Sequence, residues 1–77
     1  MDKKTRLIQT KAVFKYWQHT PSTMLECAIA TGILRANICR YVDDFRDAGT
    51  IFYLGKKTCS ISKHKAGEYT TNPELVK

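Results

Sequence analysis

The fold is decided within residues 23–42, TMLECAIATGILRANICRYV. Thr23 followed three residues later by Glu26 is a capping-box signature, which predicts a short, mostly apolar helix over residues 24–30. Gly32 ends this helix, because glycine readily takes the positive φ that a helix C-cap requires. A helix that stops so early leaves room for a second one within the same stretch.

That second helix is predicted over residues 35–48. Its apolar side chains recur at i, i+3, i+4 and i+7 on one face, namely Ile38, Tyr41, Val42 and Phe45. Gly49 supplies its stop. The spacing Ala-x3-Gly-x5-Ile-x2-Tyr, which runs from Ala28 to Tyr41, meets the steric demands of two short helices that cross at a steep angle. These features together predict a helix-turn-helix unit.

An earlier helix is predicted over residues 4–19. The stripe expected to face the core contains Leu7, Val13, Phe14 and Trp17, with a neighbouring row of Ile8, Ala12 and Tyr16. Pro21 ends this helix, because proline disfavours the helical region for the residue before it.

Two strands and a basic loop are predicted after the helices. Residues 51–54 are β-branched and aromatic, and Gly55 is expected to end them. A basic loop over residues 56–66, with an extended piece near residues 59–61, then leads to a returning strand over residues 67–71. The order of three helices and a hairpin predicts an α+β fold.

Length and composition describe one small domain. We expect it to span residues 1–77, with its core in residues 4–72 and a frayed tail at residues 73–77. The 43% hydrophobic content argues against wholesale disorder, and no run of 18 apolar residues could cross a membrane. The first residues contain no small-residue cleavage site, so we expect no secretory signal and a cytoplasmic protein.

The net charge of +6 comes from 13 Lys and Arg against 7 Asp and Glu. Residues 1–19 carry five basic residues and one acid, and residues 49–77 carry five lysines and two acids. Residues 35–48 are balanced. An excess of this size suits a polyanionic partner, usually nucleic acid, although it also occurs in small domains merely for solubility.

The three cysteines predict neither a disulfide framework nor a metal site. No close pair of the zinc-binding type exists, and Cys59 with His64 forms one weak pair that lacks two further ligands. The same pair is the one conceivable nucleophile–base set, and it has no orienting group. Cys27 is expected in the core. We therefore expect no enzyme, catalytic residue, metal, cofactor or small-molecule substrate.

The helical unit followed by two strands and a basic loop resembles the winged helix-turn-helix family over roughly residues 4–72. Residues 31–41, TGILRANICRY, and 64–73, HKAGEYTTNP, are also similar to small winged-helix proteins of phages and other mobile elements. The resemblance implies sequence-specific binding of double-stranded DNA, with helix 35–48 in the major groove and a wing on the backbone. It also implies a small transcriptional regulator or recombination accessory factor, located in the cytoplasm with the nucleoid.

Carried onto this sequence, the resemblance gives a recognition-helix set of Leu34, Arg35, Ala36, Asn37, Cys39, Arg40 and Asp43. Arg40 is expected to bind guanine, because it lies about 200° around the helix from Ile38 and so points outward. Asn37 is a weaker candidate for adenine. The expected phosphate contacts of the wing are Lys56, Lys57, Lys63, His64 and Lys65, to which Lys3, Lys4 and Arg6 can add.

Three carboxylates on helix 35–48 keep a second reading open. Asp43 can accept from a cytosine amino group, whereas Asp44 and Asp47 are expected to pair with Arg40 or Arg46, or to face a protein. The alternative function is therefore a winged-helix protein–protein module without DNA readout, with a protein partner or a homodimer. RNA or single-strand binding is a third reading, and it usually requires exposed aromatic side chains on a sheet.

Overall fold

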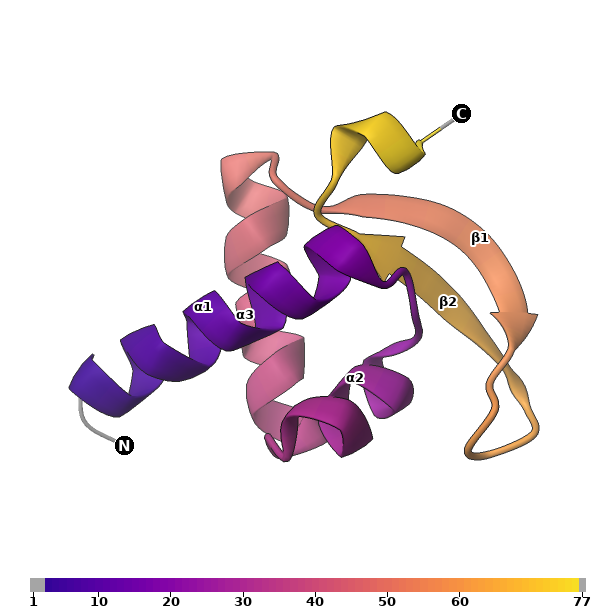
Figure 1. Cartoon of the computed structure of the whole chain (residues 1–77), viewed down its shortest axis with the longest axis horizontal. Coiled ribbons are helices and arrows are strands. Elements are labelled where there is room, and N and C mark those ends of the chain that lie inside the picture. The colour runs from indigo at the N-terminus through magenta and orange to yellow at the C-terminus, as the bar shows by residue number, and fades with distance from the viewer. Residues whose placement is uncertain (1–2, 77) are drawn as a thin grey trace.

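The computed structural model describes residues 3–76, so residues 1, 2 and 77 of the expected domain lie outside the described part. Three helices are followed by a two-stranded antiparallel sheet and a short 3-10 helix (Figure 1). The elements are α1 (Lys3–His19), α2 (Met24–Thr31), α3 (Arg35–Ala48), β1 (Phe52–Thr58), β2 (Lys65–Thr70) and η1 (Pro73–Leu75). This order confirms the α+β class and is compatible with a winged-helix layout. Within residues 3–76, no helix is both long and apolar enough to cross a membrane.

The core lies where the three helices meet. The predicted stripe of α3 is buried in full, and it packs with buried side chains of α1, α2 and the turn between α2 and α3: Val13, Trp17, Cys27, Ala28, Ile33, Ile38, Tyr41, Val42 and Phe45. Phe14 is half-buried and meets Phe45 edge to face, with ring centroids 5.5 Å apart. Full burial of one large apolar side chain contributes about 1.5–3 kcal/mol, so this cluster accounts for most of the stabilisation.

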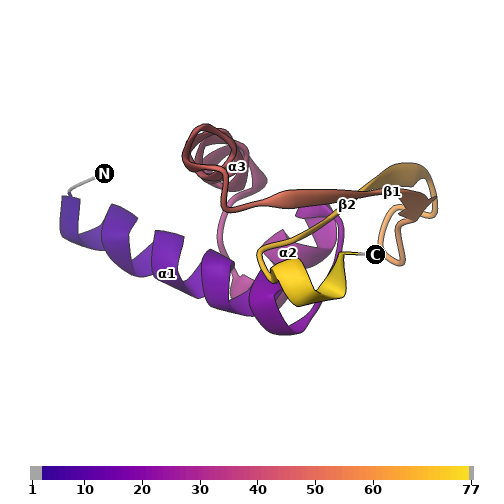
Figure 2. The same ribbon diagram turned by 90° about the horizontal axis from the view of Figure 1, so that it is seen from above.

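The first half of α1 departs from the expected pattern. Leu7 and Ile8 are 55% and 59% exposed, although Leu7 belongs to the stripe predicted to face the core. Figures 1 and 2 show the reason: α1 extends beyond α3 at its N-terminal end, so the described residues cover this part of the helix only in part. The prediction of a buried Leu7 is wrong because helical spacing does not reveal how far the covering elements reach.

The predicted cap and turn around α2 are both present. The Thr23 hydroxyl accepts a hydrogen bond from the Glu26 N–H at 3.2 Å, and the Glu26 carboxylate accepts one from the Thr23 N–H at 2.9 Å. At the other end, Gly32 has a φ of 72° and donates its N–H to the Ala28 carbonyl at 2.9 Å. The helix ends at Thr31, one residue later than predicted.

The hairpin differs most from the prediction. Gly55 does not end β1 but lies at an irregularity in its register, with a φ of 104°. β1 continues to Thr58, so Lys56 and Lys57 belong to a strand rather than to a loop. Glycine within a strand often marks a bulge, and the partner strand β2 supplies the hydrogen bonds by which β1 continues past it.

The hairpin turn is correspondingly short. Residues 60–62 form a turn where an extended piece near residues 59–61 was expected, and the Lys63 N–H donates to the Cys59 carbonyl at 2.9 Å. The tail is also more ordered than expected, because Pro73–Leu75 form η1 and the Asn72 side chain accepts from the Glu74 N–H at 3.0 Å.

The hairpin is attached to the helices by hydrogen bonds that connect distant parts of the chain. Ser22 and Tyr69 form an isolated antiparallel bridge through two backbone hydrogen bonds of 3.1 and 2.9 Å. The Thr70 hydroxyl donates to the Trp17 carbonyl at 2.8 Å, and the Thr71 hydroxyl donates to the Phe14 carbonyl at 2.7 Å. The linker between α1 and α2 thus pairs with β2 through a single residue.

Substitution of Gly32 tests the turn between α2 and α3. A Cβ at this position would have no atom within 4 Å, so a substitution costs only the strain of a left-handed backbone. We expect Gly32→Ala to lower the free energy of unfolding by about 1–2 kcal/mol in urea titrations. Gly32→Asn should cost less, because asparagine tolerates this conformation. Equal stability of the alanine variant and the parent would contradict the assigned turn.

Candidate nucleic-acid interface

Most of the expected recognition residues are exposed along α3 and at its N-cap. Leu34, Arg35, Ala36, Arg40 and Asp43 are exposed, and Leu34 is 74% exposed although it is apolar. Leu34 is also the N-cap of α3 and makes no capping hydrogen bond with its side chain. The start of this helix is therefore accessible to solvent.

Two members of the expected set lie on the flanks of α3. Cys39 is half-buried, and its Sγ lies 3.5 Å from the Met24 sulfur, so it faces α2. Asn37 is half-buried on the other flank, where it lines a hollow of about 120 Å³ together with Arg6, Arg40 and Tyr41. Cys39 is thus directed into the protein, whereas Asn37 borders a small hollow between α1 and α3.

A larger hollow of about 470 Å³ lies between the start of α3 and the hairpin. Arg35 lines it from α3, Met24 lines it from α2, and Ser62, Ala66 and Tyr69 line it from the hairpin. The structure therefore brings the beginning of α3 and the tip of the hairpin to opposite sides of one depression.

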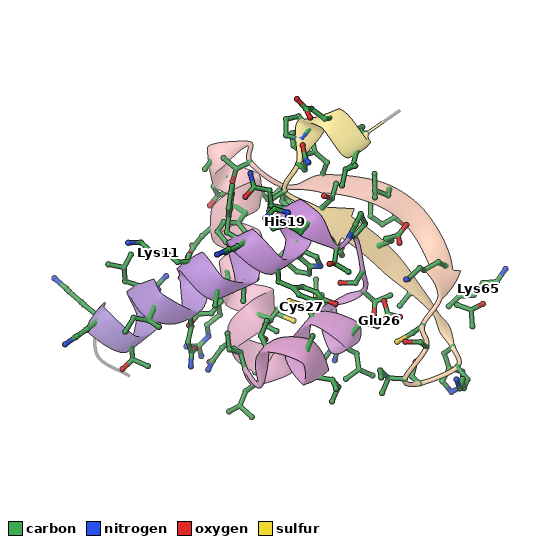
Figure 3. All side chains as sticks on the ribbon, viewed as in Figure 1. Lys11, His19, Glu26, Cys27 and Lys65 are labelled. Atoms are coloured by element: carbon green, nitrogen blue, oxygen red, sulfur yellow. The ribbon has the colours of Figure 1, made fainter. Side chains whose placement is uncertain are left out.

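Four of the five expected wing residues are exposed on the hairpin: Lys56, Lys63, His64 and Lys65. The side chain of Lys65 extends away from the rest of the molecule in Figure 3. Lys57 differs from these four, because its Nζ lies 3.0 Å from a Glu26 oxygen and 3.5 Å from a Glu68 oxygen. Its charge is therefore neutralised within the protein, which the sequence did not reveal.

Glu26 has a larger role than the sequence indicated. Besides its part in the α2 cap, its carboxylate accepts hydrogen bonds from the Ser60 N–H at 3.0 Å and from the Ser60 hydroxyl at 2.7 Å. Figure 3 shows its side chain between α2 and the hairpin. Burial favours the neutral acid, but the hydrogen bonds from Ser60, Thr23 and Lys57 outweigh it and lower the pKa of Glu26 from 4.5 to about 2. The capping-box spacing was the only local signal of this residue.

Cys59 stabilises the hairpin turn from inside. It is 1% exposed, and its Sγ lies 3.3 Å from the Thr23 hydroxyl. The Ser62 backbone N–H and the Thr23 hydroxyl lower the pKa of the Cys59 thiol to about 7. His64 contacts Cys59 through its backbone carbonyl, which accepts the Cys59 N–H at 2.9 Å. Within residues 3–76, no cluster of three or more potential metal ligands occurs.

The acidic residues of α3 do not form the pairs expected from the sequence. Asp44 accepts from an Arg6 N–H of α1 at 2.8 Å, rather than from Arg40 or Arg46. Asp43 and Asp47 are exposed, and neither forms an ion pair among the described residues. Periodicity alone could not show that α1 passes beside Asp44.

No protein-family model matches the chain, and no curated protein and no solved structure matches it significantly. The geometry of α3 and the hairpin is therefore the basis on which a function can be inferred.

Acid is expected to destabilise the protein through Glu26. A carboxyl whose pKa is lowered on folding stabilises the fold above its unfolded pKa of 4.5, and this contribution is lost as the pH falls from there toward 2. The shift corresponds to on the order of 3 kcal/mol. We expect Glu26→Gln to lower the free energy of unfolding at neutral pH and to flatten its decline in acid, as measured by urea titrations across this range. Glu74→Gln, at an exposed carboxylate, is the control, and identical acid profiles for Glu26→Gln and the parent would contradict the assignment.

Proposed function

We propose that the protein binds double-stranded DNA as a winged helix, with the first half of α3 in the major groove and the hairpin on the sugar-phosphate backbone. The observation that carries the proposal is that exposed cations occur on both elements that border the larger hollow, the start of α3 and the hairpin. Arg35 lies on its α3 side, and Lys63 and Lys65 adjoin its lining residues Ser62 and Ala66 on the hairpin side. Cations on two separate elements can contact backbone phosphates of duplex DNA at two places.

The dimensions and side chains of α3 fit the same function. A helix with its side chains is about 10–12 Å across, and the major groove is about 12 Å wide. Exposed Leu34 and Ala36 can contact thymine methyl groups, and Arg35 can reach a base edge or a phosphate. In this proposal the protein acts as a small transcriptional regulator or a recombination accessory factor of a phage or mobile element.

A protein-interaction module is the second candidate, and one observation favours it. Asp43 and Asp47 are exposed and form no ion pair among the described residues, so they would repel phosphates if the second half of α3 lay against DNA. A gel-shift experiment with random duplex DNA at low and at moderate salt separates the candidates. Salt-sensitive binding supports the DNA function, and absence of binding at low salt contradicts it.

The hairpin lysines give a prediction with an internal control. Replacing Lys56, Lys63 and Lys65 by serine should weaken binding to every duplex alike and flatten the log–log salt dependence by about 0.9 for each phosphate that is no longer neutralised. Lys57→Gln removes the same charge from the same hairpin, but its amine is bound to Glu26. We expect this variant to keep the salt slope and to melt at a lower temperature. An unchanged slope in the triple variant would exclude the hairpin from the DNA interface.

A further inference from the structure

The hollow between α1 and α3 gathers hydrogen-bond donors from two elements that are distant in sequence. Arg6 lines it from α1, and Asn37 and Arg40 line it from α3, with Tyr41 as part of its wall. Its volume of about 120 Å³ suits a small group rather than an organic ligand. The hollow is separate from the larger depression beside the hairpin, which has no lining residue in common with it.

Most of these donors have no partner among residues 3–76. One Arg6 N–H donates to Asp44 at 2.8 Å, which fixes the guanidinium beside α3 while the others stay available. The side chains of Asn37 and Arg40 make no hydrogen bond with any residue among 3–76. The guanidinium groups of Arg6 and Arg40 together with the Asp44 carboxylate have a net charge of +1. Donors in excess and a positive charge together select an anion.

We propose that this hollow binds a phosphate group, and that the group is a backbone phosphodiester of duplex DNA. The planar donor forks of Arg6 and Arg40 match the two free oxygens of a phosphodiester, which a single ammonium group cannot match in the same geometry. The identity of the phosphate source rests on the proposed DNA function, whereas the anion chemistry of the hollow does not.

The position of the hollow on α3 specifies which phosphate it contacts. Arg35 and Asn37 are two residues apart, so they project about 200° apart around the helix axis. The hairpin and Arg35 therefore lie on one flank of α3, and the Arg6–Asn37–Arg40 hollow lies on the other. A helix that fills the major groove has one strand of the duplex at each flank. The hollow binds the strand opposite the one that the hairpin contacts, and Arg40 contacts this backbone rather than guanine.

The test compares two single-charge changes on α1 in the full-length protein. Arg6→Gln removes a donor of the hollow, whereas Lys11→Gln removes the same charge from the outward side of the same helix (Figure 3). Duplex affinity is measured across a salt series. We expect Arg6→Gln to flatten the log–log salt slope by about 0.9 on selected and random duplexes alike. Lys11→Gln should keep the parent slope, and thermal unfolding verifies that both variants are folded.

A second measurement uses inorganic phosphate as the probe and follows the side-chain amide signals of Asn37 by NMR. Shifts that saturate in the parent and disappear in Arg6→Gln support the hollow as an anion site, and they identify free phosphate as the source if no duplex binds. If Arg6→Gln and the parent bind duplex DNA with the same salt slope, the hollow is not a phosphate site, and the DNA function stands. If the protein shows neither duplex binding nor phosphate-dependent shifts, both the anion site and the DNA function are overturned. A reduced selectivity with an unchanged slope in Arg40→Lys assigns Arg40 to a base and overturns its backbone role.

Discussion

The position of the hairpin depends on one carboxylate, that of Glu26. It accepts hydrogen bonds from Thr23 within the α2 cap and from Ser60 within the hairpin turn, and it pairs with Lys57 of β1. A carboxylate whose side chain is only 10% exposed is costly to desolvate, and these donors together compensate for that cost. The bonds join α2 to the hairpin, while the turn at Gly32 and the shared core join α2 to α3. The spacing between the start of α3 and the hairpin tip is therefore set by an interaction that lies on neither surface.

The same arrangement distributes charge unequally along α3. Arg35 and Arg40 occupy its first half, next to hollows that also receive residues of the hairpin and of α1. Asp43 and Asp47 occupy the second half and form no ion pair among the described residues. A polyanion that approaches this helix is attracted at one end and repelled at the other. If α3 enters a groove, it does so with its N-terminal end inward and its axis inclined, which limits base contacts to about two helical turns.

The features that could be predicted from the sequence are those whose deciding interactions are local. The capping box at Thr23, the left-handed Gly32 and the buried stripe of α3 all depend on residues within seven positions of each other. Pairs with a remote partner could not be predicted: Lys57 of β1 meets Glu26 of α2, and Arg6 meets Asp44 at a separation of 38 residues. Gly55 did not end its strand as expected, because a glycine shows that the backbone changes course but not whether another strand continues beside it. The candidate site could accordingly be located on α3 from the sequence. Which of its cations are free and which are paired within the protein could not be predicted.

The bridge between Ser22 and Tyr69 and the bond from Thr70 to the Trp17 carbonyl have a consequence for synthesis of the chain. Trp17 and Thr70 are 53 residues apart, so α1 leaves the ribosome long before β2. The Thr70 hydroxyl of β2 is the group that donates to the Trp17 carbonyl near the end of α1. Until that strand has been translated, the side of the tryptophan that meets Tyr69 has no cover, and the linker after α1 has no strand to pair with. Long-range pairing of this kind makes the closing step slow compared with helix formation. The domain can therefore close only after Tyr69 and Thr70 have left the ribosome.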